Sequence, residues 1–285
     1  LEKRGHEVGI IDGAALSVRE NYGFDDLERD ITKINPDIVG ITATTSQYLP
    51  ASKTARLVKN IRRDTKVVLG GVHVSARPVE TMKEIEEVDY GIIGEGEITT
   101  LELAEAIEQN NNRPIEGTVY RSNGEVKTAP RRGYIENLDR LPFPARHLLP
   151  MTFYRPAPLS YRKLPATSII SSRGCPYGCV YCSKSVHGNS VRFRNPERVV
   201  DEVEHLIREY GIKDLTFYDD TFTLDAGRVE RMCDAIIKRK IDIGWYCLAR
   251  VDNVNERLLS RMKRAGCYEI GYGIESGNED ILRRI

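Results

Sequence analysis

The sequence predicts an α/β protein that consists of a doubly wound parallel sheet followed by part of a βα barrel. Short apolar runs alternate with amphipathic helical stretches in the first half, and the alternation resumes after Pro165. Strands that alternate with helices favour parallel pairing. Seven prolines fall between residues 130 and 165, which is typical of a linker with few regular elements. We therefore expect a first domain at 1–129, a Pro-rich linker at 130–165 and a second domain at 166–285.

The apolar periodicity of the first domain indicates strands, helices and one hairpin. The expected strands are 8–12, 38–42, 66–71 and 90–93, and the expected helices are 25–34, 51–61, 79–86 and 98–109. The hairpin joins 117–121 to 125–128, and Asn123-Gly124 supplies the positive φ angles that a tight turn needs. Sheets of this kind bind ligands at the carboxyl ends of their strands.

The second domain shows four strand–helix units, which correspond to half to two-thirds of a βα barrel. The expected strands are 167–171, 214–218, 245–249 and 269–274, and the expected helices are 196–210, 226–238 and 255–265. We expect the remaining barrel strands to lie beyond residue 285. The first residues lack an initiator methionine and resemble the end of a helix, so we expect the chain to be truncated at both ends.

Charge and composition narrow the possible partners. Lys plus Arg and Asp plus Glu both total 42, so the formal net charge is zero and no global field attracts nucleic acid or an anionic membrane. No apolar run approaches the roughly 18 residues of a membrane span, and the start is not a signal peptide. Six cysteines are present, none before Cys175, which favours a reducing cytoplasm and a metal role over disulfides.

The strongest chemical signal is a loop with three closely spaced cysteines, Cys175, Cys179 and Cys182. Iron–sulfur clusters are held by cysteine thiolates, usually four, so three thiolates leave one iron open to a chelating small molecule. The alternative is a closed structural zinc site in which His187 supplies the fourth ligand. The strand before the loop and the βα alternation after it favour the active-site loop of a barrel.

This CxxxCxxC loop resembles that of radical S-adenosylmethionine (SAM) enzymes, and the resemblance covers residues 165–285. It implies a TIM-like barrel whose three cysteines are the catalytic metal ligands of a [4Fe–4S] cluster. SAM then chelates the fourth iron, and Tyr181 lies near the adenine. One electron, from a donor such as flavodoxin or ferredoxin, cleaves SAM to methionine and a 5′-deoxyadenosyl radical.

Three later strand ends fall where such a barrel contacts SAM. Asp219 and Asp220 could accept hydrogen bonds from the amino group of SAM. The family more often carries a Gly-Gly-Glu-like segment here, so the resemblance does not decide which Asp has this role. The alternative role for either Asp is capping of the helix that follows. Arg250 could bind the carboxylate bidentately, with a surface salt bridge as its alternative role. Glu275, between glycines at a strand end, could bind the ribose hydroxyls.

The first half resembles the Rossmann-like cobalamin-binding domain that precedes one large group of radical SAM enzymes. Small, hydroxylated and glycine residues at strand ends would let the sheet edge approach a bulky nucleotide tail. The residues that this resemblance assigns to cobalamin are Thr42, Thr44, Gly70, Gly71, His73, Gly94 and Glu95. The segment 138–144 resembles the linker of the same group.

One departure concerns cobalt ligation. Cobalamin domains of the methionine-synthase kind carry an Asp-x-His-x-x-Gly loop whose histidine binds cobalt, and this chain has no such triplet. We therefore interpret His73 as a hydrogen-bonding residue that contacts the cofactor or a neighbouring loop. Radical methylthiotransferases are disfavoured, because their first domain brings three further cysteines and none occurs here before Cys175.

The resemblance implies radical chemistry on an unactivated carbon of a small-molecule substrate, with methylcobalamin delivering a methyl group. A radical cyclase or rearrangement enzyme with the same cofactors is the first alternative. A cobalamin-type binding or sensor module attached to an inactive barrel is the second. The sequence does not predict the substrate or the oligomeric state.

Overall fold

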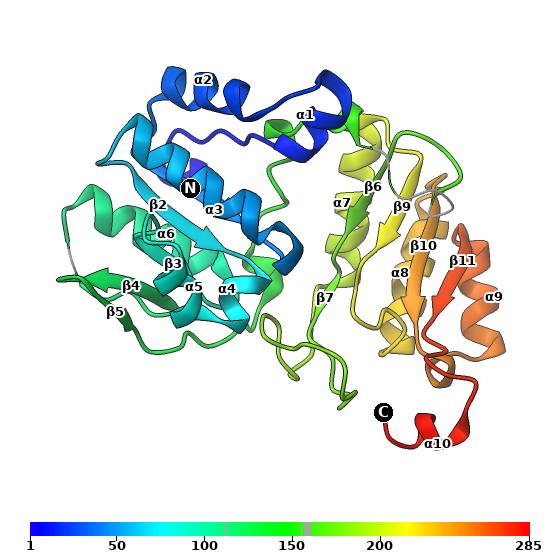
Figure 1. Cartoon of the computed structure of the whole chain (residues 1–285). Helices are drawn as coiled ribbons and strands as arrows, with labels where there is room; N and C mark the ends of the chain where they lie inside the picture. Colours follow the sequence, from blue (N-terminus) through cyan, green and yellow to red (C-terminus); the bar gives the residue numbers. More distant parts are fainter. Residues whose placement is uncertain (112, 155, 157–160) are drawn as a thin grey trace. The chain divides into compact units, whose positions relative to one another are not determined.

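The structure is a computed structural model that describes all residues except 112, 155 and 157–160. The chain forms two compact units, of which the first comprises residues 1–135 and 185–187 and the second residues 136–184 and 188–285 (Figure 1). The boundaries of the predicted domains and of the linker stay predictions. Among the described residues, no helix is both long and apolar enough to cross a membrane.

A five-stranded sheet forms the centre of the first unit, with its strands in chain order β1-β2-β3-β4-β5. These strands are β1 (Ile38–Thr42), β2 (Lys66–Gly70), β3 (Tyr90–Ile92), β4 (Thr118–Ser122) and β5 (Glu125–Thr128). The first three are parallel, whereas β4 and β5 form an antiparallel hairpin at the edge. Asn123 and Gly124 have φ angles of 52° and 80°, which confirms the predicted turn.

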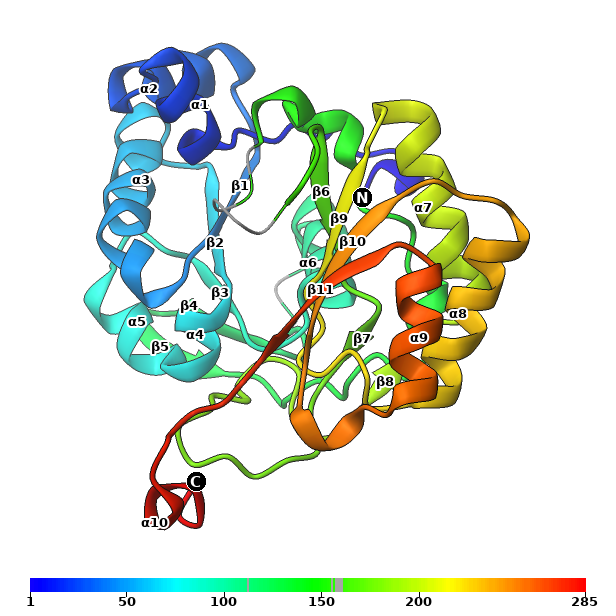
Figure 2. The same ribbon diagram turned by 90° about the vertical axis from the view of Figure 1, so that its right-hand side faces the viewer.

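Helices cover both faces of this sheet (Figure 2). They are α1 (Gly13–Glu20), α2 (Phe24–Ile34), α3 (Tyr48–Ile61), α4 (Val72–Ala76), α5 (Pro78–Glu84) and α6 (Gly96–Glu108). Val67 and Leu69 of β2 pack in one core with residues of α2 to α5. Val68 lies between them in sequence and packs with α6 in a second core, because successive strand side chains point to opposite faces.

The predicted strand at 8–12 is wrong, because among the described residues this segment pairs with no strand. Ile10 is 45% exposed, so this side chain gains little from packing in an extended conformation. Asp12 instead accepts a hydrogen bond from the Ala15 amide at 3.0 Å and begins α1. The short helices α1 and α4 were not predicted, because five to eight residues are too few to display a clear helical period.

Four parallel strands in the order β11-β10-β9-β6 form the sheet of the second unit, which confirms the predicted partial barrel. They are β6 (Ala166–Ile169), β9 (Asp214–Phe217), β10 (Gly244–Ala249) and β11 (Cys267–Tyr272). The helices are α7 (Pro196–Tyr210), α8 (Ala226–Lys238), α9 (Glu256–Arg264) and the short α10 (Glu279–Leu282). Trp245 packs at the centre of the core, with its ring centroid 5.4 Å from that of Phe217 and 5.5 Å from that of Phe222.

The remaining regular elements are short. The strands β7 (Ser172–Arg173) and β8 (Arg192–Phe193) form a separate antiparallel pair that the sequence did not predict. The 3-10 helices are η1 (Glu2–Arg4), η2 (Thr45–Gln47), η3 (Leu138–Arg140), η4 (Arg146–Leu148), η5 (Met151–Phe153) and η6 (Val251–Asn253). Within the described part of 130–165, the regular elements are thus limited to single 3-10 turns.

Candidate active site

The cysteine loop spans residues 174–191 and begins and ends at the paired strands β7 and β8. Gly174 starts it with a φ of 86°, a left-handed conformation that side chains disfavour. The Cys175 amide donates a hydrogen bond to the Gly188 carbonyl at 3.3 Å, and the Lys184 ammonium donates to the Cys175 carbonyl at 3.3 Å. These contacts hold the first cysteine against the returning arm of the loop.

All three cysteines of the loop are free thiols, with Cys175 and Cys179 half-buried and Cys182 exposed. The Cys182 amide donates to the Cys179 carbonyl at 3.1 Å, which makes a tight turn between the second and third cysteine. In the part of the chain that the structure describes, no three His, Cys, Asp or Glu side chains converge as metal ligands. The donor set, three free thiols on one irregular loop, is the chemistry that iron–sulfur clusters require. The role of these cysteines as ligands stays a prediction.

Arg250, at the end of β10, lies beside this loop. Its guanidinium stacks on the ring of Tyr177 at 3.9 Å and forms two hydrogen bonds with Asp252, at 3.1 and 2.9 Å. Hydrogen bonding to Asp252 raises the pKa of Arg250, and the Cys179 thiol adds a smaller contribution in the same direction. The positive charge of Arg250 thus lies near Cys179, the second cysteine. The salt bridge with Asp252 is also present, and it is the alternative role that the sequence left open for Arg250.

Tyr181 and Glu275 come together from the loop and from the end of β11. Desolvation, followed by a hydrogen bond with the Glu275 carboxylate, raises the pKa of Tyr181 to about 12, and Cys179 contributes further. The phenol is therefore protonated at neutral pH and lies close to the carboxylate. Glu275 is exposed and has a φ of 61°. The structure thus brings together two predicted SAM contacts and one predicted cluster ligand.

The two neighbouring aspartates after β9 have different surroundings. Asp219 is 1% exposed, and its carboxylate accepts three hydrogen bonds of 2.6 Å from Ser171 and Ser172. Asp220 is exposed. Neither caps α8, because Asp225 accepts the hydrogen bond from the Arg228 amide at 2.8 Å. Of the two predicted contacts to the SAM amino group, Asp220 is the one whose carboxylate faces solvent.

The carboxyl ends of β1 and β2 meet in the first unit, where four predicted cobalamin contacts lie. Thr42 and Thr44 are exposed, Gly70 ends β2, and Gly71 follows with a φ of 99°. A Cβ on Gly71 would lie 2.6 Å from the Ala43 carbonyl oxygen. Gly71 is therefore required for the close packing of the two strand ends, whatever ligand binds above them.

His73 is buried in α4, and its interpretation as a hydrogen-bonding residue agrees with its contacts. Its Nδ1 lies 3.2 Å from the Thr45 hydroxyl, and its ring packs on Tyr48 with a centroid distance of 4.7 Å. The histidine thus connects the loop after β1 to the loop after β2. Its contact with cobalamin stays a prediction.

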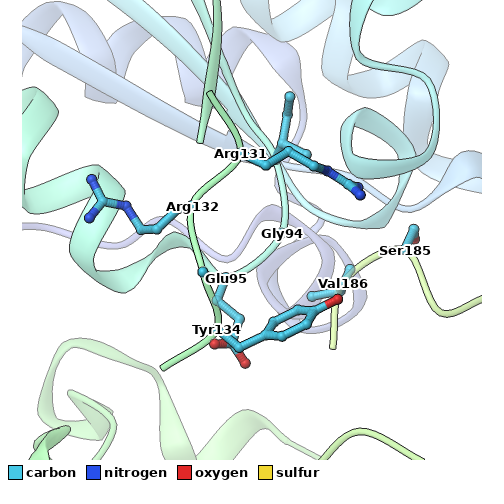
Figure 3. A pocket seen from close by; sticks show the side chains of 9 residues that line it. Gly94, Glu95, Arg131, Arg132, Tyr134, Ser185 and Val186 are labelled. Atoms are coloured by element: carbon cyan, nitrogen blue, oxygen red, sulfur yellow. The ribbon is translucent and has the colours of Figure 1, made fainter. Parts of the chain in front are cut away.

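A cavity of about 170 Å³ opens next to Gly94 and Glu95, at the end of β3 (Figure 3). Glu95 is 8% exposed; one carboxylate oxygen accepts a hydrogen bond from the Ile135 amide at 2.8 Å, and the other lies 3.2 Å from His187 Nδ1. His187, the fourth ligand of the zinc alternative, therefore pairs with Glu95.

The sequence did not predict most of the residues around this cavity. Its lining comprises Ile93, Gly94, Glu95, Arg131, Arg132, Gly133, Tyr134, Ser185 and Val186. Four of them, at 131–134, belong to a stretch without regular structure, where periodicity gives no signal. The sequence feature that could have identified these four residues is the run Arg131-Arg132-Gly133-Tyr134.

A substitution at Gly71 tests how closely the strand ends pack. We expect Gly71→Ala to destabilise the protein by about 1–3 kcal/mol, because the new Cβ meets the Ala43 backbone and an L-residue is strained at this φ. The matched control is Gly70→Ala, whose Cβ would meet no atom within 4 Å. Chemical denaturation of both variants measures the difference, and equal stabilities would contradict the close packing.

Two families match the chain. The B12 binding domain family matches residues 1–104, and the Radical SAM superfamily matches residues 169–285. These matches agree with the resemblance stated for each half of the sequence.

Curated relatives match along most of the chain. The uncharacterized methyltransferase PH0819 of Pyrococcus horikoshii is 41% identical, over 100% of this chain and 61% of that protein. The anaerobic magnesium-protoporphyrin IX monomethyl ester cyclase of Rubrivivax gelatinosus is 30% identical, over 88% of this chain and 46% of that protein. The chain thus spans 61% and 46% of the lengths of these two relatives.

A solved structure shows the same fold. The radical SAM methyltransferase TsrM from Kitasatospora setae, solved with tryptophan substrate and a SAM analogue bound, matches with a TM-score of 0.78. The identity is 20%, and the match covers 99% of this chain and 56% of that chain. The predicted fold class, an α/β sheet domain followed by a partial βα barrel, is therefore confirmed.

Proposed function

Because the chain belongs to the cobalamin-binding group of radical SAM enzymes, with a B12-binding domain ahead of its radical SAM domain, we propose that it cleaves SAM reductively and transfers a methyl group to an unactivated carbon. The observation that carries this proposal is the loop of three free thiols after the first strand of the barrel. Catalytic residues of βα barrels lie at this end of the strands.

Cys175, Cys179 and Cys182 would hold a [4Fe–4S] cluster with one iron open to SAM. When bound, the cluster supplies the electron that cleaves the sulfonium of SAM. The chain's contribution is to present all three as free thiols on one loop. A reducing cytoplasm suits free thiols.

Side chains around the loop match the polar groups of SAM. Asp220 is exposed and would accept hydrogen bonds from the amino group. Arg250 forms a bidentate pair with Asp252 and would bind the SAM carboxylate in the same way by exchanging Asp252 for SAM. Glu275 would accept from the ribose hydroxyls, next to the Tyr181 phenol.

Cobalamin would bind at the carboxyl ends of the strands in the first unit. There Thr42, Thr44, Gly70 and Gly71 present small or hydroxylated surfaces that let a large ligand approach the backbone. The 41% identical relative is named a methyltransferase, which supports methyl transfer as the outcome. The substrate would be a small molecule, and a flavodoxin- or ferredoxin-like protein would donate the electron.

The 30% identical relative is named a cyclase, so cyclisation with the same cofactors is the competing outcome. Methyl transfer and cyclisation differ in whether carbon from the methyl group of SAM enters the product. A cyclase incorporates none.

The test is metal and corrinoid analysis of anaerobically purified and reconstituted protein, followed by turnover with methyl-labelled SAM. We expect about four irons per chain, stoichiometric cobalamin, 5′-deoxyadenosine formation and a labelled product. If the protein binds iron but no cobalamin, reductive cleavage of SAM would stand and cobalamin-dependent methyl transfer would be rejected. Zinc in place of iron would overturn the proposal, because a closed zinc site has no open coordination position.

A further inference from the structure

A buried polar network surrounds the two ends of the cysteine loop. We call it the loop-base network, and it consists of Ser171, Ser172, Arg194, Asp219 and Arg228. Ser171, Ser172, Asp219 and Arg228 are each less than 5% exposed. Ser171 and Ser172 precede the cysteines, and Arg194 follows the loop. Asp219 lies between β9 and α8, and Arg228 lies on α8.

Asp219 holds the start of the loop through both of its carboxylate oxygens. One accepts from the Ser171 amide, and the other accepts from the hydroxyls of Ser171 and Ser172, all at 2.6 Å. A carboxylate without a proton accepts at every lone pair, which suits three converging donors. An asparagine would instead direct an NH₂ group at one of them.

Two arginines hold the carbonyl groups of the same backbone segment. Arg194 donates through Nη1 to the Ile170 carbonyl at 3.1 Å, and its amide donates to the Ser171 carbonyl at 3.0 Å. Arg228 donates through Nη2 to that Ser171 carbonyl at 2.8 Å and through Nε to the Arg194 carbonyl at 3.3 Å. Arg228 thus connects the chain entering the loop to the chain leaving it.

Charge balance explains why these groups are buried together. An isolated carboxylate or guanidinium is costly to bury unless it is paired and hydrogen-bonded. Burial lowers the pKa of Arg228, and the nearby Asp219 carboxylate opposes this shift, so each group offsets the charge of the other. The loop interior is held by backbone hydrogen bonds of Cys175, Cys182 and Gly188 and by the Tyr177 hydroxyl, which donates to Asn253 at 2.9 Å. The loop-base network holds the two ends.

We propose that Asp219 is a positioning residue that fixes the start of the cysteine loop directly and its end by way of Ser171 and Arg228. We further propose that Asp220 alone of the pair contacts SAM. This inference rests on the proposed function for the identity of the loop's ligand. The placement of the loop ends follows from hydrogen bonds that do not involve any ligand.

The experiment compares Asp219→Asn with Asp220→Asn in two measurements. Hydrogen exchange of peptides spanning 170–194 reports on the loop ends without any cofactor. We expect exchange about tenfold or more faster in Asp219→Asn, because hydrogen bonds to a charged acceptor are lost, and wild-type exchange in Asp220→Asn. Reconstituted protein then gives the rate of iron release to a chelator and the affinity for SAM.

We expect Asp219→Asn to release iron about tenfold or more faster and, while still loaded, to bind SAM with wild-type affinity. Asp220→Asn should show weaker SAM binding with unchanged iron release. The reverse pattern, or wild-type exchange in Asp219→Asn, overturns the inference. If Asp219→Asn does not fold, Ser172→Ala decides, since it removes one of the three bonds and should accelerate exchange of the same peptides.

The two measurements separate this inference from the proposed function. If the wild-type protein binds no iron, the proposed function fails, while the exchange data still show whether Asp219 holds the loop ends. If the wild-type protein binds iron and Asp219→Asn exchanges and releases iron at wild-type rates, the inference alone fails.

Discussion

Replacing Cys175 by alanine is expected to remove the iron of the reconstituted protein and to reduce 5′-deoxyadenosine formation to background. Two thiolates do not hold a cluster that uses three protein ligands and one open iron. The backbone of Cys175 is fixed through both its amide and its carbonyl, by Gly188 and Lys184. Iron analysis and chromatographic detection of 5′-deoxyadenosine measure the two effects.

The matched control is Cys233→Ala. Cys233 is a buried free thiol on α8, and burial raises its pKa to about 12, so it remains a neutral thiol rather than a thiolate ligand. We expect this variant to retain the wild-type iron content. Retention of iron and cleavage activity in Cys175→Ala would exclude the loop as the cluster site.

Replacing Glu202 by alanine is expected to lower the free energy of unfolding by about 3–5 kcal/mol, since it leaves the buried guanidinium of Arg146 and the half-buried guanidinium of Arg194 without their counter-ion. The Glu202 side chain is 1% exposed and lies 2.7 Å from Arg146 Nη1 and 2.6 Å from Arg194 Nη2. Arg146 also donates to the Ser168 carbonyl at 2.9 Å, so the loss affects the end of β6. The sole tryptophan, Trp245, lies in the core of this unit, and its fluorescence reports the unfolding.

Glu204→Ala provides the control on the same helix. Its side chain is 42% exposed and pairs with Arg239 at 2.7 Å. Exposed ion pairs contribute little, so we expect a change of at most about 1 kcal/mol. Equal effects of the two substitutions would show that the Glu202 pair is not buried in solution.

The sequence predicted the long elements well. The helices α7 and α8 and the strand β1 begin and end at the predicted residues, because each combines a clear apolar period with start and stop signals. It failed at 8–12, where an apolar run has no neighbouring strand to pair with in the described residues. It also missed β7 and β8, since a two-residue strand carries no periodicity.

For the candidate site, the sequence proposed a set of residues but did not predict how their surroundings differ. Asp219 and Asp220 are adjacent and chemically identical, and the sequence left both open as SAM contacts. Their burial separates them, with one directed into the protein and the other exposed. His187 likewise had the spacing of a zinc ligand, yet it pairs with Glu95, which is distant in sequence.

The sequence by itself determined the fold class, the order of the strand–helix units and the cysteine loop, because apolar period and ligand spacing are local properties of the chain. The tertiary structure decided that Asp219 and Arg228 fix the ends of the loop and that Gly71 packs against Ala43. These contacts join residues 28 to 57 positions apart. They depend on which strand ends meet, and no local pattern in the sequence encodes that.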